Sequence, residues 1–445
     1  MISEWTIRFV ATIAVGVISQ SSAAQNVSIP GVTLEDFFTA AINFSPDLKI
    51  AEETVKISSA RRRAANGQLL PQVSAGANVS DNRLNQSNRF LEYRGERYGL
   101  SLSQTLFNWQ QFSARKESYL FEDAQEEEYY YRLGLLLTEV AEKYFSVLQA
   151  EDALESIESE IDSITNQVNQ IQNLYDRQLA QVTDLYQGRA SLAGVQAEQL
   201  RLEAELALNQ EALRSVSGLE IGPLYRLSDS AEISGLEHSL NYYVNQSKES
   251  NHQIQARKYG LEAAREAVSG SKGTFMPTVS IIAQRQDSDV GFDNLPQNKT
   301  DNTYVGLNLS IPIYAGGRNS AAISEAVSRR SIAESELRAT QLEIGANVRS
   351  AYLQVQSSEA QTNAARVLLE STLIAAEAMQ QGFTLGTVTS VDVLNALRDQ
   401  YRAERDLQRT RYEHIIYLLS LKRETGALSA EDMLEVGSWL EPAPQ

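Results

Sequence analysis

Residues 130–175 read YYRLGLLLTEVAEKYFSVLQAEDALESIESEIDSITNQVNQIQNLY, and the apolar side chains in this stretch recur at steps of three and four residues. Thirteen such steps cover 45 residues, about 3.5 residues per step. A period near 3.5 predicts a left-handed coiled coil, because it keeps one face of the helix against its neighbour. The intervening positions carry Gln, Asn, Ser, Glu and Arg, so the other faces can remain hydrated. The recurring residues are Tyr130, Leu133, Leu137, Val140, Tyr144, Val147, Ala150, Leu154, Ile157, Ile161, Ile164, Val168, Ile171 and Tyr175.

The helical pattern extends well beyond this stretch. Residues 108–173 contain no proline and one glycine, Gly134, and residues 318–381 contain no proline and one glycine, Gly345. At 1.5 Å per residue, a continuous helix over 108–173 would be roughly 100 Å long. Such a length exceeds a bilayer several times and suits the width of a compartment between two membranes. We therefore expect a mostly helical protein.

The two halves of the chain repeat one pattern. LPQVS at 70–74 is answered by MPTVS at 276–280, and GLSLS at 99–103 by GLNLS at 306–310. TDL at 183–185 is answered by VDV at 391–393. Because the offset stays between 206 and 208 residues over more than 110 positions, the sequence predicts an internal tandem duplication.

Each half is interpreted as helix, strand, loop, strand, long helix, turn and helix. The opening helices are expected at 34–66, with an interruption near Ser45-Pro46, and at 239–271. In the first repeat, 25–238, we expect strands at about 68–83 and 95–107, a long helix at 108–173, a turn at 174–183, a helix at 184–217 and a less regular segment at 218–238. In the second repeat, 239–425, we expect strands at about 275–287 and 302–314, a long helix at 317–382, a turn at 383–390 and a helix at 391–425. Residues 426–445 form a C-terminal segment.

The expected strands alternate apolar and polar side chains. Tyr98, Leu100 and Leu102 alternate with Gly99, Ser101 and Ser103, for example, whereas the third strand is less regular because Ile281 and Ile282 are adjacent. One apolar and one polar face is typical of a barrel with lipid outside and water inside. A soluble antiparallel sheet with one face on a core remains the alternative. Aromatic residues near the strand ends favour the membrane barrel, because such side chains anchor at lipid interfaces.

Four strands are too few to close a barrel, and open sheet edges are not tolerated in hydrocarbon. The strands of several chains must therefore be pooled. Three copies would give twelve strands, although the sequence itself does not determine the number. Membrane lipid is then a partner of the apolar face.

The N-terminus has the pattern of a targeting signal. Arg8 precedes the apolar run 9–18, and Ser22, Ala23 and Ala24 follow it. This arrangement predicts a signal peptide at 1–24, cleaved after Ala24. A membrane anchor is the alternative, but the apolar run is shorter than the roughly 18–20 residues that a spanning helix needs. No later stretch has that length, so any membrane must be crossed without helices.

Composition excludes several classes of protein. The chain has no cysteine, which rules out disulfides, thiol chemistry, cysteine zinc sites and an N-terminal lipidated cysteine. Its net charge of −18 and lack of a basic tract argue against nucleic-acid binding. His238, His252 and His414 lie far apart, and no phosphate loop or nucleophile motif occurs. We therefore expect no enzyme, no cofactor and no metal site.

The chain resembles the TolC family of outer-membrane efflux and type I secretion channels. The residues that carry the likeness are IPIYAGG at 311–317, GFTLGTVTSVDVLNA at 382–396 and ETGAL at 424–428. The resemblance implies a homotrimer with a twelve-stranded transmembrane barrel, continued by a helical barrel through the periplasm. It implies an equatorial belt from residues 218–238 and 426–445. It also implies a periplasmic adaptor and an inner-membrane pump or ABC transporter as partners, and the missing cysteine favours the general-purpose branch.

The turn before the last long helix carries the first candidate site. Asp392, Asn395 and Asp399 lie at i, i+3 and i+7 and share one helix face. If that face lines a tunnel in a threefold assembly, each residue forms a ring, and acidic rings select cations. Helix capping is the alternative, with Ser390 as N-cap and Asp392 in the first turn. Thr183 and Asp184 occupy the equivalent place in the first repeat.

Family members resemble one another in a polar network that keeps the periplasmic entrance closed. The present chain retains Asp392, Thr183 and Asp184 of that network. It has Phe383 for a tyrosine, Val388 for an arginine, Asn395 for an aspartate and Asn173 for a glutamine, and Tyr175 is assigned to the same gate. We hypothesise that Arg177 replaces the missing arginine opposite Asp184.

The resemblance also implies adaptor docking at the two turns. Leu385, Gly386 and Thr387 match the family pattern in the second turn. In the first turn Gln178 stands where the family has glycine, next to Leu179. Two functions remain open at this point: an export duct, for efflux or for protein secretion, and a secreted coiled-coil protein that tethers parts of the cell envelope.

Overall fold

The computed structural model describes residues 32–86, 89–228, 231, 233, 235–291 and 294–442. The expected signal peptide lies outside the described residues. Contacts divide the chain into two compact units. The sheet unit comprises Ala51–Glu128 and Gln255–Thr340, and the helical unit comprises the described parts of Met1–Ile50, Tyr129–Ile254 and Gln341–Gln445.

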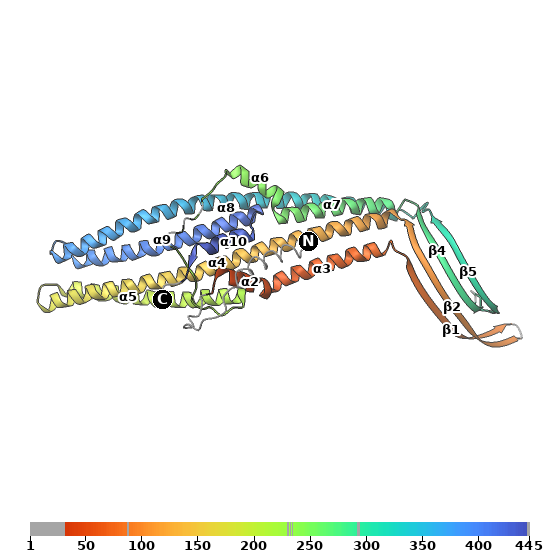
Figure 1. Cartoon of the computed structure of the whole chain (residues 1–445), viewed down its shortest axis with the longest axis horizontal. Coiled ribbons are helices and arrows are strands. Elements are labelled where there is room, and N and C mark those ends of the chain that lie inside the picture. Colours follow the sequence, from red (N-terminus) through yellow and green to blue (C-terminus); the bar gives the residue numbers. More distant parts are fainter. Residues whose placement is uncertain are drawn as a thin grey trace, which may run out of the picture. The chain divides into compact units, whose positions relative to one another are not determined.

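The sheet unit contains one antiparallel four-stranded sheet (Figure 1). Its strands are β1 (Gln72–Gln86), β2 (Arg89–Phe107), β4 (Thr278–Val290) and β5 (Pro296–Ser310), in the order β1-β2-β4-β5. Four strands, two from each repeat, were expected and are present. The last strand ends at Ser310 and not near 314, because Ser310 pairs with Thr278, the first residue of β4, and Pro312 has no N–H to donate.

The strand register separates an apolar from a polar face. Val73, Leu102, Ala283 and Val305 lie in one row across all four strands. The neighbouring row on the opposite face contains Ser74, Ser101, Gln284 and Tyr304, with Ser74 and Ser101 hydrogen-bonded at 2.7 Å. Directly opposed residues share a face, so the alternation seen in the sequence continues across all four strands in these two rows.

The same register accounts for the adjacent isoleucines of β4. Ile281 lies opposite Leu307 and belongs to the apolar face. Ile282 lies opposite Ser103 and Gly306 on the polar face. Of the helices in the described ranges, none offers a stretch long and apolar enough to span a membrane.

Helices of both repeats complete the sheet unit. They are most of α3 (Pro46–Gly67) and α7 (His252–Gly273), the start of α4 (Trp109–Asp176) and the start of α8 (Arg318–Thr384). The helix expected over 34–66 is interrupted at Ser45, as predicted. Its counterpart in the second repeat is also interrupted, at Asn251, because the Asn251 side chain accepts from the Ile254 N–H at 3.1 Å and caps the new helix.

The helical unit holds the remainder of α4 and α8 together with α2 (Leu34–Phe44), α5 (Val182–Ser217), α6 (Leu240–Ser250), α9 (Ser390–Thr425) and α10 (Ala430–Ser438). Short turns join α4 to α5 and α8 to α9, so that each pair runs antiparallel (Figure 1). The segments 218–238 and 426–445 contribute β3 (Arg226–Leu227) and β6 (Leu440–Glu441), which pair with each other. Both long helices continue past their expected ends, to Asp176 and Thr384.

Most of the heptad positions of α4 are buried within the helical unit. Leu133, Val140, Tyr144, Ile157 and Ile171 are each at most 3% exposed. Leu154 and Ile161 are half-buried. The period of about 3.5 residues therefore marks the packed face of the helix, as expected.

Two glycines end the last helix of each repeat in the same way. Gly218 and Gly426 follow α5 and α9 at an offset of 208 residues, with φ of 71° and 72°. A Cβ on Gly426 would lie 2.3 Å from the Ser250 carbonyl oxygen, and one on Gly218 would lie 2.6 Å from the Phe44 ring. Each glycine therefore lets a helix end pack against the interruption of an opening helix.

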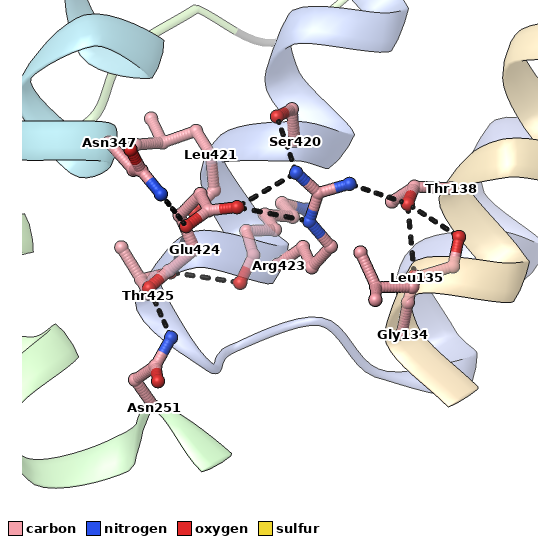
Figure 2. A network of polar contacts seen from close by, with 11 residues as sticks. Gly134, Leu135, Thr138, Asn251, Asn347, Ser420, Leu421, Arg423, Glu424 and Thr425 are labelled. Carbon is pink, nitrogen blue, oxygen red and sulfur yellow. Dashed lines mark hydrogen bonds and ion pairs between the residues drawn. The ribbon is translucent and has the colours of Figure 1, made fainter. Parts of the chain in front are cut away.

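The second repeat adds a polar network at this junction (Figure 2). Arg423 donates to Thr138 Oγ1 on α4 at 2.9 Å and to Glu424 Oε1 at 2.8 Å. Asn347 on α8 donates to Glu424 Oε2 at 3.4 Å, and Asn251 donates to the Glu424 carbonyl at 2.9 Å. The first repeat has Ser215 and Val216 at the positions of Arg423 and Glu424, so it cannot form this network.

Candidate functional site: the two helix turns

The first turn, between α4 and α5, ends α4 with a residue in the left-handed conformation. The Gln178 N–H donates to the Tyr175 carbonyl at 2.8 Å, and the Leu179 N–H donates to the Leu174 carbonyl at 2.8 Å. Gln178 itself has φ of 61°. These two bonds form a Schellman motif, which terminates a helix and satisfies its last carbonyls.

The second turn, between α8 and α9, uses the same two bonds. The Gly386 N–H donates to the Phe383 carbonyl at 3.0 Å, and the Thr387 N–H donates to the Gly382 carbonyl at 2.9 Å. Gly386 has φ of 75°. The duplication therefore extends to individual hydrogen bonds at the turns.

A capping box begins α9, and its N-cap is Thr389. Thr389 Oγ1 donates to Asp392 Oδ2 at 2.6 Å, and the Asp392 N–H donates back to Thr389 Oγ1 at 3.3 Å. The expectation that Ser390 is the N-cap was wrong, because Ser390 is already the first helical residue and only Thr389 has an extended backbone. The hydrogen bonds from Thr389 stabilise the carboxylate and lower the pKa of Asp392.

Asp392, Asn395 and Asp399 all lie exposed on α9, whereas Val393, Leu394 and Leu397 are buried. The helix thus presents its polar face outward and its apolar face to the helical unit. Asp392 takes part in the helix cap and is still exposed, because both cap hydrogen bonds go to the same carboxylate oxygen, Oδ2. Such a face supplies a ring of negative charge only if several copies of α9 surround one axis.

The equivalent helix start in the first repeat has no side-chain cap. Gln181 occupies the N-cap position of α5, and its side chain makes no capping bond. Thr183 donates to Gln181 Oε1 at 3.3 Å. Asp184 and Arg177 form no ion pair with each other among the described residues of the chain.

Phe383 lies in an apolar cluster and not with the polar residues of the first turn. It packs with Met379 against buried Val393 and Leu397. Val388 lies over Gly382, where an added Cβ would come within 2.8 Å of the valine. Two polar groups of the family pattern are thus replaced here by apolar packing, while Asn173 and Tyr175 remain exposed at the end of α4.

The residues assigned to adaptor docking lie at the surface of the turns. Leu179 is 73% and Leu385 is 78% exposed. Gln178, Gly386 and Thr387 are exposed beside them. Two large apolar side chains that the helical unit leaves uncovered are suited to contact another protein.

Comparison with known proteins gives the family. The family described as outer membrane efflux protein matches residues 39–219 and 243–427, one segment in each repeat. The chain belongs to this family. It is therefore an outer-membrane export channel protein and not an enzyme, it lies in the outer membrane, and it extends into the periplasm. The predicted duplication is confirmed by the same two segments.

Individual relatives agree with this family. The chain is 27% identical to outer membrane protein TolC of Vibrio cholerae over 388 residues, which cover 85% of this chain and 87% of that protein. It is 25% identical to the alkaline protease secretion protein AprF of Pseudomonas aeruginosa, over 75% of this chain and 70% of that protein. Among solved structures, VceC of Vibrio cholerae has the same fold, with a TM-score of 0.74 at 20% identity, covering 88% of this chain and 96% of that one.

Sequence reasoning missed a set of polar contacts through which this efflux-family chain joins α4 to α9. Ser163 and Tyr401 are hydrogen-bonded at 2.6 Å, and Arg405 donates to Glu160 at 2.9 Å. Tyr412 donates to Asp152 at 2.5 Å. The sequence does contain one signal for these contacts. The three residues on α4 are separated by three and eight positions, and their partners on α9 are separated by four and seven positions in the opposite direction, as expected for antiparallel helices.

Burial governs the electrostatics of these contacts. Glu160 is 1% exposed, and its burial raises the pKa of its carboxyl although Arg405 opposes the shift. Burial likewise raises the pKa of Asp152, and the hydrogen bond from Tyr412 opposes it. The first repeat is thus fastened to the second along the helices that lead to the turns.

Proposed function

We propose that three copies of the chain assemble into one export duct, whose twelve pooled strands cross the outer membrane. The observation that carries this proposal is the strand order β1-β2-β4-β5, which leaves β1 and β5 as edges in the single chain. An edge strand in hydrocarbon has unsatisfied N–H and C=O groups, so β5 of one copy is expected to pair with β1 of the next. Three repetitions close the barrel.

The turns at the ends of α4 and α8 are proposed to form the periplasmic gate of this duct. In a threefold assembly Asp392, Asn395 and Asp399 would each form a ring, and the exposed polar face of α9 supports this assignment. Thr183, Asp184, Asn173, Tyr175 and Phe383 are assigned to the same gate. Arg177 and Asp184 do not pair within one chain, so a bridge between them would join neighbouring copies.

The exposed apolar residues of the turns are proposed to dock a periplasmic adaptor. Leu385, Gly386 and Thr387 would contribute one side of the docking surface, and Gln178 and Leu179 the other. An inner-membrane pump or ABC transporter would then deliver substrate into the duct. Relatives named for efflux and for protease secretion support both uses, and the tethering alternative does not fit the family.

Oxidative crosslinking between neighbouring copies tests this proposal. A cysteine pair placed on β1 and β5, at Ala75 and Thr303, which lie on the same face of the sheet, should crosslink on oxidation, and the chain has no cysteine of its own to interfere. Edge pairing between copies predicts crosslinked trimers on a denaturing gel. A control pair at Ala75 and Leu100, which lie opposite each other on β1 and β2, should crosslink only within the chain. Monomers alone in the edge variant would contradict the proposal.

A further inference from the structure

The sheet unit contains a cavity of about 710 Å³ between α4 and α7, and its lining includes none of the residues assigned above to the gate or to adaptor docking. Its apolar lining comes from Trp109, Phe112, Tyr119 and Leu120 on the first turns of α4. Its volume lies within the roughly 300–1,000 Å³ of sites that bind small organic molecules. The cavity begins two residues after β2 ends at Phe107.

The cavity results from where the two helices can approach each other. A Cβ on Gly273 would lie 2.8 Å from Trp109, and one on Gly270 would lie 3.2 Å from Ser113. These glycines of α7 allow close packing at the end next to the sheet. One to two turns further from the sheet, α7 carries Glu262 and Glu266 in place of glycine, and there the helices leave the space open.

Aromatic contact connects the cavity with the apolar face of the sheet. The rings of Phe107 and Phe112 pack edge to face, with their centroids 6.0 Å apart. Phe107 pairs with Val279, which pairs with Leu309, so it lies in the apolar rows of the sheet. The aromatic lining of the cavity is therefore continuous with the apolar rows of the sheet, and Trp109 is a residue type suited to a membrane interface.

The charged groups around the cavity have both signs. The Arg115 guanidinium donates to the uncharged side chain of Asn66 at 2.7 Å. The Lys116 ammonium forms an ion pair with Glu266, with 3.1 Å between Nζ and Oε1. Glu262 pairs with Arg265 at 2.5 Å. A purely anionic ligand would meet two carboxylates here, whereas a zwitterion would meet a complementary group at each end.

We propose that this cavity binds one zwitterionic phospholipid per chain, from the leaflet of the outer membrane that faces the periplasm. Its phosphate would lie at Arg115 and Lys116, its ammonium at Glu262 and Glu266, and the upper part of an acyl chain among Trp109, Phe112 and Leu120. Such a lipid would fasten the helices below the sheet to the membrane. This inference rests on the proposed duct, since only a membrane-embedded sheet brings the cavity to the interface.

The experiment measures lipid retained by the purified full-length assembly. Native mass spectrometry after incubation with phosphatidylethanolamine should show up to one lipid per chain. Leu120→Trp, which fills the cavity, and Arg115→Gln, which removes a phosphate contact, should each reduce retention at least threefold. Arg329→Gln removes another exposed arginine of the same unit, ion-paired with Glu325, and should leave lipid retention unchanged.

Two outcomes would overturn the proposal. Equal retention in wild type, Leu120→Trp and Arg115→Gln would show that lipid binds elsewhere, and preference for phosphatidylglycerol would show that the site takes anionic lipid. Bilayer conductance of the same samples separates the two proposals. Variants that conduct normally but keep their lipid refute the lipid site alone, whereas a wild type without conductance refutes the duct.

Discussion

Gln178 holds in the first turn the left-handed backbone position that Gly386 holds in the second. Both residues donate their N–H to a carbonyl three residues earlier, and their φ angles are 61° and 75°. A side chain in this conformation costs of order 1–3 kcal/mol, which glycine does not incur. The first turn therefore stores strain that the second turn lacks.

Gln178→Gly should stabilise the protein by about 1 kcal/mol, after the larger entropy of unfolded glycine is subtracted. Chemical denaturation of the purified protein measures this change. Gln187→Gly is the matched control, because Gln187 is exposed within α5. Glycine at this helical position should lower the stability of the protein by about 1 kcal/mol. Equal destabilisation by both substitutions would show that the turn is unstrained.

Gly426→Ala should destabilise far more than Gly218→Ala. The added methyl group would meet the Ser250 carbonyl in the first case and the Phe44 ring in the second. A ring can rotate away, whereas backbone at a helix junction cannot move without disturbing α6 and α9. We expect a loss of more than about 3 kcal/mol at Gly426 and about 1–2 kcal/mol at Gly218, measured by denaturation. Similar losses at both sites would contradict the packing of α9 on Ser250.

Thr389→Ala should lower the thermal midpoint by roughly 2 °C or more, because it removes the N-cap of α9. The effect should depend on pH in a defined direction. The cap lowers the pKa of Asp392. The electrostatic part of the stabilisation is therefore fully present above the ordinary pKa of 3.8, and it is lost as pH falls through the lowered pKa. Thermal melts of wild type and variant should therefore converge towards acid. A difference that grows at low pH would argue against the cap.

Tyr412→Phe should destabilise the protein by about 1–3 kcal/mol at neutral pH, because it leaves the half-buried Asp152 carboxylate without its donor. Burial already raises the pKa of Asp152 above 3.8, so the folded protein holds this proton more tightly than the unfolded chain. The stabilisation that comes from this tighter proton binding is fully present below pH 3.8, and it is lost as pH rises through the raised pKa of Asp152. The variant should extend this loss to higher pH.

Tyr401→Phe is the control for Tyr412→Phe. Tyr401 bonds to the neutral Ser163, so its removal should cost about 1 kcal/mol at every pH. Melting curves of both variants between pH 4 and 8 provide the comparison. Parallel pH profiles for the two would show that Asp152 does not titrate in this range.

Much of the architecture could be predicted from the sequence, because periodicity and duplication are local signals. The heptads of α4, the alternation in β2 and the break at Ser45 each depend on a few neighbouring residues. The cap at Thr389 was also within reach, since Thr389 and Asp392 have the spacing of a capping box while Ser390 would place Val393 at the third position.

Other features required the three-dimensional structure. The contact of Tyr412 with Asp152 joins residues 260 positions apart, and no local pattern predicts it. The burial of Phe383 depends on how α8 packs on α9. The cavity beside Leu120 depends on glycines of another helix, Gly270 and Gly273, whose effect on packing is invisible in a single segment.

The gate assignment also yields a direct substitution. Arg177→Ala should raise the conductance of the closed duct, if Arg177 bridges to Asp184 of a neighbouring copy and holds the entrance shut. Arg189→Ala is a suitable control, since Arg189 lies nearby on α5 and bonds to Gln172 of its own chain. Unchanged conductance in Arg177→Ala would remove this residue from the gate.

Single-channel recording in planar lipid bilayers tests the central claim most directly. The purified protein should produce discrete conductance steps with selectivity for cations. Asp392→Asn combined with Asp399→Asn should reduce that selectivity without abolishing the steps, because only the proposed acidic rings are removed. The absence of any conductance from correctly inserted wild-type protein, or unchanged selectivity in the double variant, would contradict a duct gated at the turn before α9.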